Sequence, residues 1–307
     1  MSAHNSVAHL DSETKVDQYV KSRSYWETAL LRIRQDRLTM VALTILLCIT
    51  MMSALAPFIT SNILHLDPNQ TNPTQNFLPP GTGPYILGTD DIGRDQLARL
   101  LHAGGVSMRI GIFGAAFSLS IGVSMGVISG YFGGMVDDVM NWLITTIDSI
   151  PSLYLLILFA AIFSPSAETL ILVISLISWT SSMRLIRGQT LALREQEYVI
   201  AARALGANAW RIMFVHIVPN LISITIISMT LTIAGLILTE SALSYLGLGV
   251  QPPQATWGNM LSKSQQFFRQ GPHLVIFPGL MIFITVLCAY VIGDGLRDAF
   301  DPTIRNR

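Results

Sequence analysis

Charged residues are scarce in this sequence. Asp, Glu, Lys and Arg make up 12% of the 307 residues, against about 25% in an ordinary soluble domain. The net charge is zero and no basic patch with interleaved aromatics occurs, which argues against nucleic acid as a partner. Cysteine is also rare. Cys48 and Cys288 both lie in apolar stretches, so the sequence suggests neither a disulfide framework nor a metal site.

The chemistry of an enzyme is equally hard to find. No HExxH zinc motif and no convergent acid/base cluster occurs, so a membrane enzyme is the least favoured class of function. The phosphate-binding loop G-x-x-x-x-G-K-[ST] is missing as well, so the chain has no visible means of holding a nucleotide. We therefore expect no catalytic residue, metal or cofactor in this chain.

The sequence contains long apolar runs without charged residues. Residues 38–66, 110–136, 212–239 and 270–293 contain no Asp, Glu, Lys or Arg, and each run reaches the ~20 residues needed to cross a bilayer. Two shorter runs lie between them. The sequence therefore predicts an all-α membrane protein with about six spans, at 38–59, 109–132, 139–163, 168–184, 213–238 and 274–293.

The positions of Lys and Arg predict the orientation of these spans. Cytoplasmic segments carry an excess of basic residues. With both termini inside, the inner segments 1–37, 133–138, 185–212 and 294–307, together with Arg184 at a border, hold 14 of the 19 basic residues. We therefore expect both termini in the cytoplasm.

One face of the second span consists of small residues. They recur every four positions, which places them on one side of a helix. Such a stripe favours close packing of a second helix, and a pore lining is the less favoured alternative. The residues are Gly114, Ser118, Gly122, Gly126 and Gly130.

The third span contains an acid, Asp148, three residues before Pro151. Acids inside a membrane are costly and usually face the protein interior or water. A proton relay is one reading of Asp148 and would indicate an ion-coupled transporter. The favoured reading is that Asp148 caps backbone groups or lines a wet vestibule beside the helix break that Pro151 makes.

The segment 194–213, between the fourth and fifth spans, is amphipathic. On a helix, Tyr198, Ala201, Ala202 and Leu205 form a flat apolar strip, with Arg194, Glu195 and Arg203 beside it. Gly206 is expected to end that helix in a left-handed conformation, and residues from Ala207 to 214 start the next one. Small alanines suit insertion into a cleft of a partner, whereas lipid binding would favour larger apolar residues.

This segment, YVIAARALGANAWRIMFVHIVPN (198–220), resembles the EAA loop of binding-protein-dependent ABC transporter permeases. Ala201, Ala202, Gly206 and the later Ile217 and Pro219 match the pattern. Ile200 stands where the family usually has Glu, so one charged contact is absent. The resemblance implies that Tyr198, Ala201, Ala202, Arg203, Gly206 and Ala207 form the surface that couples to an ATPase.

Two further segments, LGTDDIGRDQLARLLHAGGVSMRIG (87–111) and TESALSYLGLGVQPPQATWGNML (239–261), resemble the dipeptide/oligopeptide/nickel permease subfamily and its second, C-type subunit. GDGLRDAFDPTIR (293–305) fits the same group. The resemblance implies a heterodimer with a related B-type permease, two ABC ATPase subunits that bind ATP and Mg, and an extracytoplasmic solute-binding protein. It also implies a multi-pass subunit of a bacterial or archaeal cytoplasmic membrane, embedded in the lipid bilayer.

The expected organisation follows from these segments. A cytoplasmic tail (1–37), in which residues 24–37 could form a short interfacial helix, precedes the first span (38–59) and an extracytoplasmic loop (60–108). The permease domain (109–293) contains the coupling segment 194–213, and a cytoplasmic tail (294–307) ends the chain. The resemblance implies an importer of dipeptides or oligopeptides. Nickel or another small solute, and an ion-coupled transporter that uses Asp148, are the alternatives.

Overall fold

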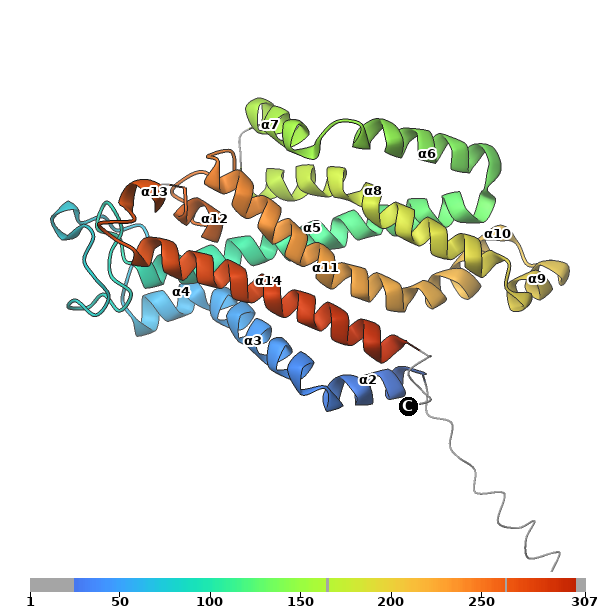
Figure 1. Ribbon diagram of the computed structural model, residues 1–307, viewed down its shortest axis with the longest axis horizontal. Coiled ribbons are helices and arrows are strands. Elements are labelled where there is room, and N and C mark those ends of the chain that lie inside the picture. Colours follow the sequence, from blue (N-terminus) through green and yellow to red (C-terminus); the bar gives the residue numbers. More distant parts are fainter. Residues whose placement is uncertain (1–24, 164–165, 263, 302–307) are drawn as a thin grey trace, which may run out of the picture.

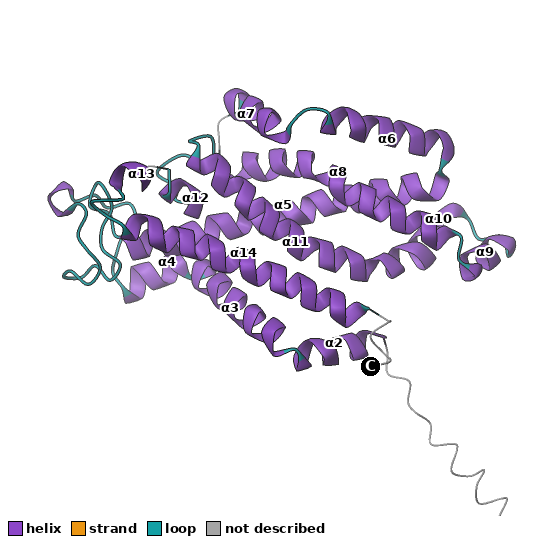
Figure 2. Cartoon of the chain, viewed as in Figure 1, coloured by secondary structure: helices purple, strands orange, loops and turns teal. Residues whose placement is uncertain are grey.

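The computed structural model describes residues 25–163, 166–262 and 264–301. Residues 1–24 of the predicted N-terminal tail and 302–307 of the predicted C-terminal tail lie outside these ranges. Helices dominate the described residues (Figure 2). The only strand-like pairings among them are two isolated bridges, Thr82 with Tyr85 and Thr89 with Asp95. The all-α prediction is therefore confirmed.

Within the described ranges, five helices are long and apolar enough to cross a membrane. They are α3 (Arg37–Ala54), α5 (Gln96–Phe132), α8 (Ala167–Arg194), α11 (Val218–Tyr245) and α14 (His273–Phe300). The pair α6 (Gly134–Asp148) and α7 (Ser152–Ile162) is bent by 76° and gives a sixth span if it counts as one. This agrees with the six predicted spans, and the bend lies where Pro151 predicted a break.

Short elements connect the long helices. They are α2 (Tyr25–Gln35), α4 (Ala56–Phe58), a π-helical turn (Ile59–Ile63), a 3-10 turn (Pro73–Gln75), α9 (Glu197–Ala204), α10 (Ala209–Arg211), a second π-helical turn (Ile212–Ile217), α12 (Trp257–Met260) and α13 (Ser264–Phe267).

The helices are longer than the apolar runs that predicted them. The expected loop 60–108 is wrong over its last thirteen residues, because α5 begins at Gln96 and runs for 37 residues. Asp95 caps this start: its carboxylate accepts a hydrogen bond from the Ala98 N–H at 2.6 Å. At 1.5 Å per residue, α5 is about 55 Å long and exceeds the thickness of a bilayer core. The fourth span is likewise longer, since α8 continues to Arg194.

The helix α5 runs alongside α8 (Figure 1). Its small-residue stripe faces α8 over much of its length. A Cβ on Gly122 would lie 2.6 Å from the Ser182 Cβ and 3.0 Å from the Met183 nitrogen. A Cβ on Gly126 or Gly130 would lie 2.9 Å from a backbone oxygen of α8. Near the other end of the stripe, the Ser175 hydroxyl of α8 donates to the Gly114 carbonyl at 3.0 Å. The backbones of the two helices therefore approach closely, as small residues allow.

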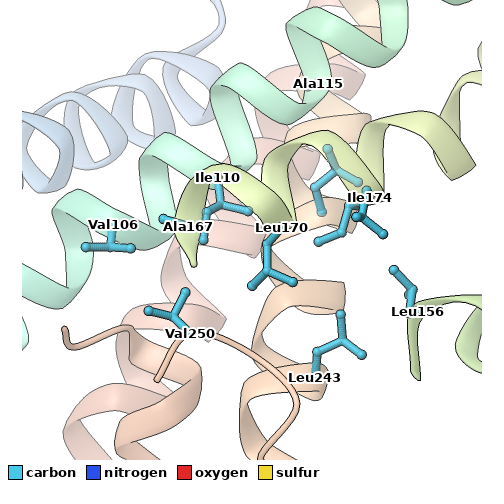
Figure 3. Close-up of a cluster of buried hydrophobic side chains, with 11 residues drawn as sticks. Val106, Ile110, Ala115, Leu156, Ala167, Leu170, Ile174, Leu243 and Val250 are labelled. Atoms are coloured by element: carbon cyan, nitrogen blue, oxygen red, sulfur yellow. The ribbon is translucent and has the colours of Figure 1, made fainter. Parts of the chain in front are cut away.

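A buried apolar cluster closes the bundle beyond the stripe (Figure 3). It joins α5, α7, α8, α11 and the segment that follows α11. Its members include Val106, Ile110, Ala115, Leu156, Ala167, Leu170, Ile174, Leu243 and Val250.

The two ends of the bundle differ in character. Residues 64–95 and the short helices α12 and α13 lie at one end, and α9 lies at the other (Figure 1). The helix α2 packs on the last turn of α14 near the α9 end. There the Arg32 Nη1 donates to the Asp301 carbonyl at 2.9 Å, and the rings of Trp26 and Phe300 are 5.4 Å apart. The described parts of the N-terminal and C-terminal regions therefore lie on the same side of the molecule.

Replacing Gly126 with Ala is predicted to destabilise the protein by about 1–3 kcal/mol, because the new methyl group overlaps the Met183 carbonyl and the Ile186 side chain. The midpoint of thermal unfolding of the purified protein in detergent measures this loss. Gly188→Ala, on α8, is the control because no atom lies within 4 Å of its Cβ position. An equal effect of both substitutions would contradict the close packing.

Candidate functional site

The helix α9 forms a short projection at one end of the bundle (Figure 1). It starts after Gln196, whose backbone is extended, and ends at Leu205. Gly206 follows with a φ of +84°, and the Ala207 N–H donates back to the Ala202 carbonyl at 3.1 Å. This confirms the left-handed helix end that Gly206 predicted.

One face of α9 is anchored in the bundle. Val199 is fully buried in an apolar cluster with Ile186 of α8 and Met213 of the π-helical turn before α11. The Arg203 guanidinium lies 5.8 Å from the centre of the Tyr131 ring, at the end of α5, a cation–π distance. The projection therefore contacts the ends of α5 and α8 and the π-helical turn before α11.

The opposite face of α9 is apolar and exposed. Leu205 is 89% exposed and Tyr198 is 42% exposed, and Ala201 between them is exposed as well. Ile200, on another side of the helix, is 50% exposed. Exposed apolar groups gathered on one helix are typical of a surface that a partner covers. We call Tyr198, Ala201, Ala202 and Leu205 the coupling ridge.

Two residues predicted beside this ridge lie elsewhere. Arg194 is the last residue of α8 and Glu195 follows it, so neither belongs to α9. The Arg194 Nη1 donates to the Gly130 carbonyl at 3.1 Å. Arg194 therefore connects the ends of α8 and α5. Helical periodicity assigned Arg194 to the wrong helix, because no Gly or Pro marks the break at 195–196.

Asp148 belongs to a separate site, at the bend between α6 and α7. Its Oδ1 accepts a hydrogen bond from the Thr180 hydroxyl at 3.0 Å, and its Oδ2 pairs with the Arg184 guanidinium. Both partners are on α8. The carboxylate thus joins α6 to α8 through side chains, and no bond from Asp148 to a backbone group is seen in the described residues.

A cavity of about 470 Å³ opens beside Asp148, between the α6–α7 bend, α8 and α11. Its polar lining, apart from Asp148, consists of serine and threonine hydroxyl side chains. They are Ser152, Ser178, Thr180, Ser181, Ser182, Thr232 and Thr239. The position of Asp148 in this wall fits the expected polar vestibule.

The cavity does not resemble a metal site. Within the described ranges, no three His, Cys, Asp or Glu side chains come together in a way that could hold a metal ion. Hydroxyl groups and one carboxylate can instead donate and accept hydrogen bonds to a polar solute.

Comparison with known proteins gives the family. A family model described as binding-protein-dependent transport system inner membrane component matches residues 122–306. A second, described as the N-terminal TM domain of oligopeptide transport permease C, matches residues 24–80. The chain belongs to the binding-protein-dependent transport permeases. The second match also confirms the predicted resemblance to the C-type subunit.

Individual relatives extend this likeness over nearly the whole permease. It is 40% identical over 285 residues to the oligopeptide transport system permease protein OppC of Bacillus subtilis, a match that covers 93% of this chain and 92% of that protein. It is 36% identical to the dipeptide transport system permease protein DppC of Alkalihalophilus pseudofirmus, over 94% and 93% of the two chains. It is 37% identical to DppC of Haemophilus influenzae, over 89% and 92%.

The two segments that indicated the subfamily from the sequence meet in the folded permease, through a residue that sequence reasoning did not select. Glu240 is fully buried near the end of α11. Its carboxylate accepts hydrogen bonds from the Ser244 hydroxyl at 2.7 Å and from the Ser107 hydroxyl of α5 at 3.2 Å. The Ser107 oxygen in turn accepts from the Trp257 N–H at 3.2 Å.

This network folds the segment after α11 back onto α5. The Trp257 indole donates to the Leu100 carbonyl at 3.2 Å, and Thr256 and Asn259 form a reciprocal cap at the start of α12. The signal in the sequence was the end of a charge-free run. The predicted fifth span ends at residue 238, whereas α11 continues to Tyr245 and holds Glu240 as a buried acceptor in its last turns.

Replacing Glu240 with Ala is predicted to loosen the segment 246–262, because Ser107 and Ser244 lose their buried acceptor. Backbone amide exchange in this segment is expected to rise at least about tenfold, which corresponds to about 1.4 kcal/mol. Hydrogen–deuterium exchange with mass spectrometry measures it. Thr225→Val is the control, because the Thr225 hydroxyl bonds only within α11, to the Leu221 carbonyl. Unchanged exchange in Glu240→Ala would contradict the role of the network.

Proposed function

We propose that this permease forms half of the translocation pathway of an ATP-driven importer for oligopeptides or dipeptides. The observation that carries the proposal is the coupling ridge: an exposed apolar surface whose opposite face is anchored in the ends of the membrane helices. Family membership supports it, and so do the relatives described as oligopeptide and dipeptide permeases. The subunit itself performs no covalent chemistry.

The ridge suits the cleft of an ATPase subunit. Its exposed members carry no charge, and Ile200 presents an apolar group where the family usually presents an acid. We infer that docking here depends on shape and apolar burial more than on an ion pair. ATP and Mg bind to the two ATPase subunits, and a related B-type permease supplies the other half of the pathway.

The contacts of α9 suggest how ATPase closure reaches the membrane. A displacement of the ridge acts on α5 through Arg203 and Tyr131, and on α8 and α11 through the cluster around Val199. The close packing of α5 on α8 favours movement of this pair as one body. Nucleotide binding then shifts the population between inward-open and outward-open states of the cavity beside Asp148.

The proposal also sets the orientation. The end that carries α9 faces the cytoplasm, as the excess of basic residues predicts, and the end with residues 64–95, α12 and α13 faces the solute-binding protein outside. The membrane is the cytoplasmic membrane of a bacterium or archaeon. The lipid bilayer covers the exposed apolar side chains that no subunit contacts.

The ion-coupled alternative receives no support from the cavity. A proton relay needs a series of titratable groups, and the other polar residues that line this cavity are Ser and Thr. Within the described residues, no second titratable side chain lines this cavity to accept a proton from Asp148. Nickel or another small solute stays possible for the subfamily, and no specific observation favours it over a peptide.

Replacing Ala201 with Glu is predicted to uncouple the complex, because a charge on the ridge would be buried at the docking surface. Stimulation of ATP hydrolysis by the loaded binding protein is expected to fall at least about tenfold, a change of about 1.4 kcal/mol. The assay uses the complete complex in proteoliposomes.

The control is Gln196→Glu, which adds the same charge to an exposed position just before α9. A negative charge is favourable at the start of a helix, so this variant should retain stimulation and peptide import. Normal stimulation by the Ala201→Glu complex would refute docking through the ridge.

A further inference from the structure

The cavity beside Asp148 has one ionisable group in its wall. Asp148 is the only Asp, Glu, Lys, Arg or His among its lining residues. The hydroxyl side chains around it come from three separate elements: the start of α7, α8 and α11. The volume of about 470 Å³ lies within the range of about 300–1,000 Å³ that is usual for small-molecule sites.

The position of this acid is electrostatically unfavourable without a cation. Asp148 is the last residue of α6, where unsatisfied carbonyl groups give a helix a partial negative charge. A positive partner therefore stabilises a carboxylate there. In the present state, the Arg184 guanidinium fills that role.

A second ion pair between the same two helices differs from this one. Arg187 engages Asp137 through both Nε and Nη2, and the Ser129 hydroxyl donates to the same carboxylate. The side chains of Arg187 and Asp137 are 27% and 14% exposed, whereas those of Arg184 and Asp148 are 51% and 33% exposed. The Arg187–Asp137 pair has two contacts and is mostly buried. The Arg184–Asp148 pair has one contact and lies at a solvent-accessible wall, so a competing cation can exchange with Arg184.

We propose that Asp148 binds the α-ammonium group of the peptide in transit, in exchange for Arg184. This inference rests on the proposed peptide import. An ammonium group is compact and has three donors, which match the Asp148 carboxylate and the neighbouring hydroxyl oxygens. The α-ammonium is common to unmodified linear peptides, and hydroxyl groups pair with backbone amides of any sequence. The site therefore recognises the peptide main chain and leaves side-chain choice to other components.

The first test compares two neutralising variants of the reconstituted complex, supplied with saturating peptide-loaded binding protein. Asp148→Asn is expected to slow import at least about tenfold, as the loss of a charge-assisted contact would. Arg184→Gln removes only the competing cation and is expected to retain import, with an equal or lower KM. If the pair is merely a structural link, both variants will be impaired equally, and that result overturns the proposal.

Two controls keep this test decisive. Asp137→Asn and Arg187→Gln, at the buried pair, are expected to resemble each other in their effect on import. The double variant Asp148→Asn with Arg184→Gln restores charge balance. It should fold even if Arg184 without its partner prevents folding, and it should still import slowly. Wild-type import by the double variant overturns the proposal.

The second test changes the peptide. A dipeptide and its des-amino analogue, each preloaded on the binding protein, are followed through a single turnover. The analogue is expected to cross the wild-type complex about tenfold more slowly. In Asp148→Asn it is expected to cause no further loss of rate, because the substitution and the missing ammonium group remove the same contact. Independent, additive losses overturn the inference while peptide import stands. A wild-type complex that imports no peptide overturns the proposed function itself.

Discussion

The close packing of α5 on α8 is the contact on which the rest of the structure depends. Lipid provides no hydrophobic force to hold two helices together, so small side chains and backbone proximity must do it. Gly122, Gly126 and Gly130 let the two backbones meet, and the ends of this pair then hold the other elements. Arg194 connects its α9 end, and the buried cluster around Ile110 closes the other.

The sequence predicted features that depend on local chemistry. Apolar runs located the five long helices and the bent pair α6–α7, Pro151 located the bend, and Gly206 located a helix end. Prediction from the sequence failed for features that depend on contacts between residues far apart in the chain. Residues 96–108 contain Arg99 and lie in the predicted loop, but they are helical, with the Asp95 cap at their start and the Leu100 carbonyl bonded to Trp257. The buried role of Glu240 could not be predicted from its neighbours, because its partner Ser107 on α5 is distant in the sequence.

The proposed coupling ridge and the cavity beside Asp148 differ in how much of each the sequence predicts. The proposed coupling ridge lies on one short helix with a regular apolar strip, so its residues can be chosen from the sequence alone. The cavity beside Asp148 combines α6, α7, α8 and α11, and neither its hydroxyl lining nor the partner Arg184 follows from the neighbourhood of Asp148 in the sequence. A site that several helices share requires the fold before it can be described.

The length of α5 has a mechanical consequence. A single unbroken helix of about 55 Å carries Tyr131, which contacts α9, near one end and Leu100, which holds Trp257, near the other. A rigid rod that tilts about its middle moves its two ends in opposite directions. Under the proposed coupling, an inward swing at the α9 end would accompany an outward swing at Leu100, so the tilt of one helix would link the two ends of the molecule.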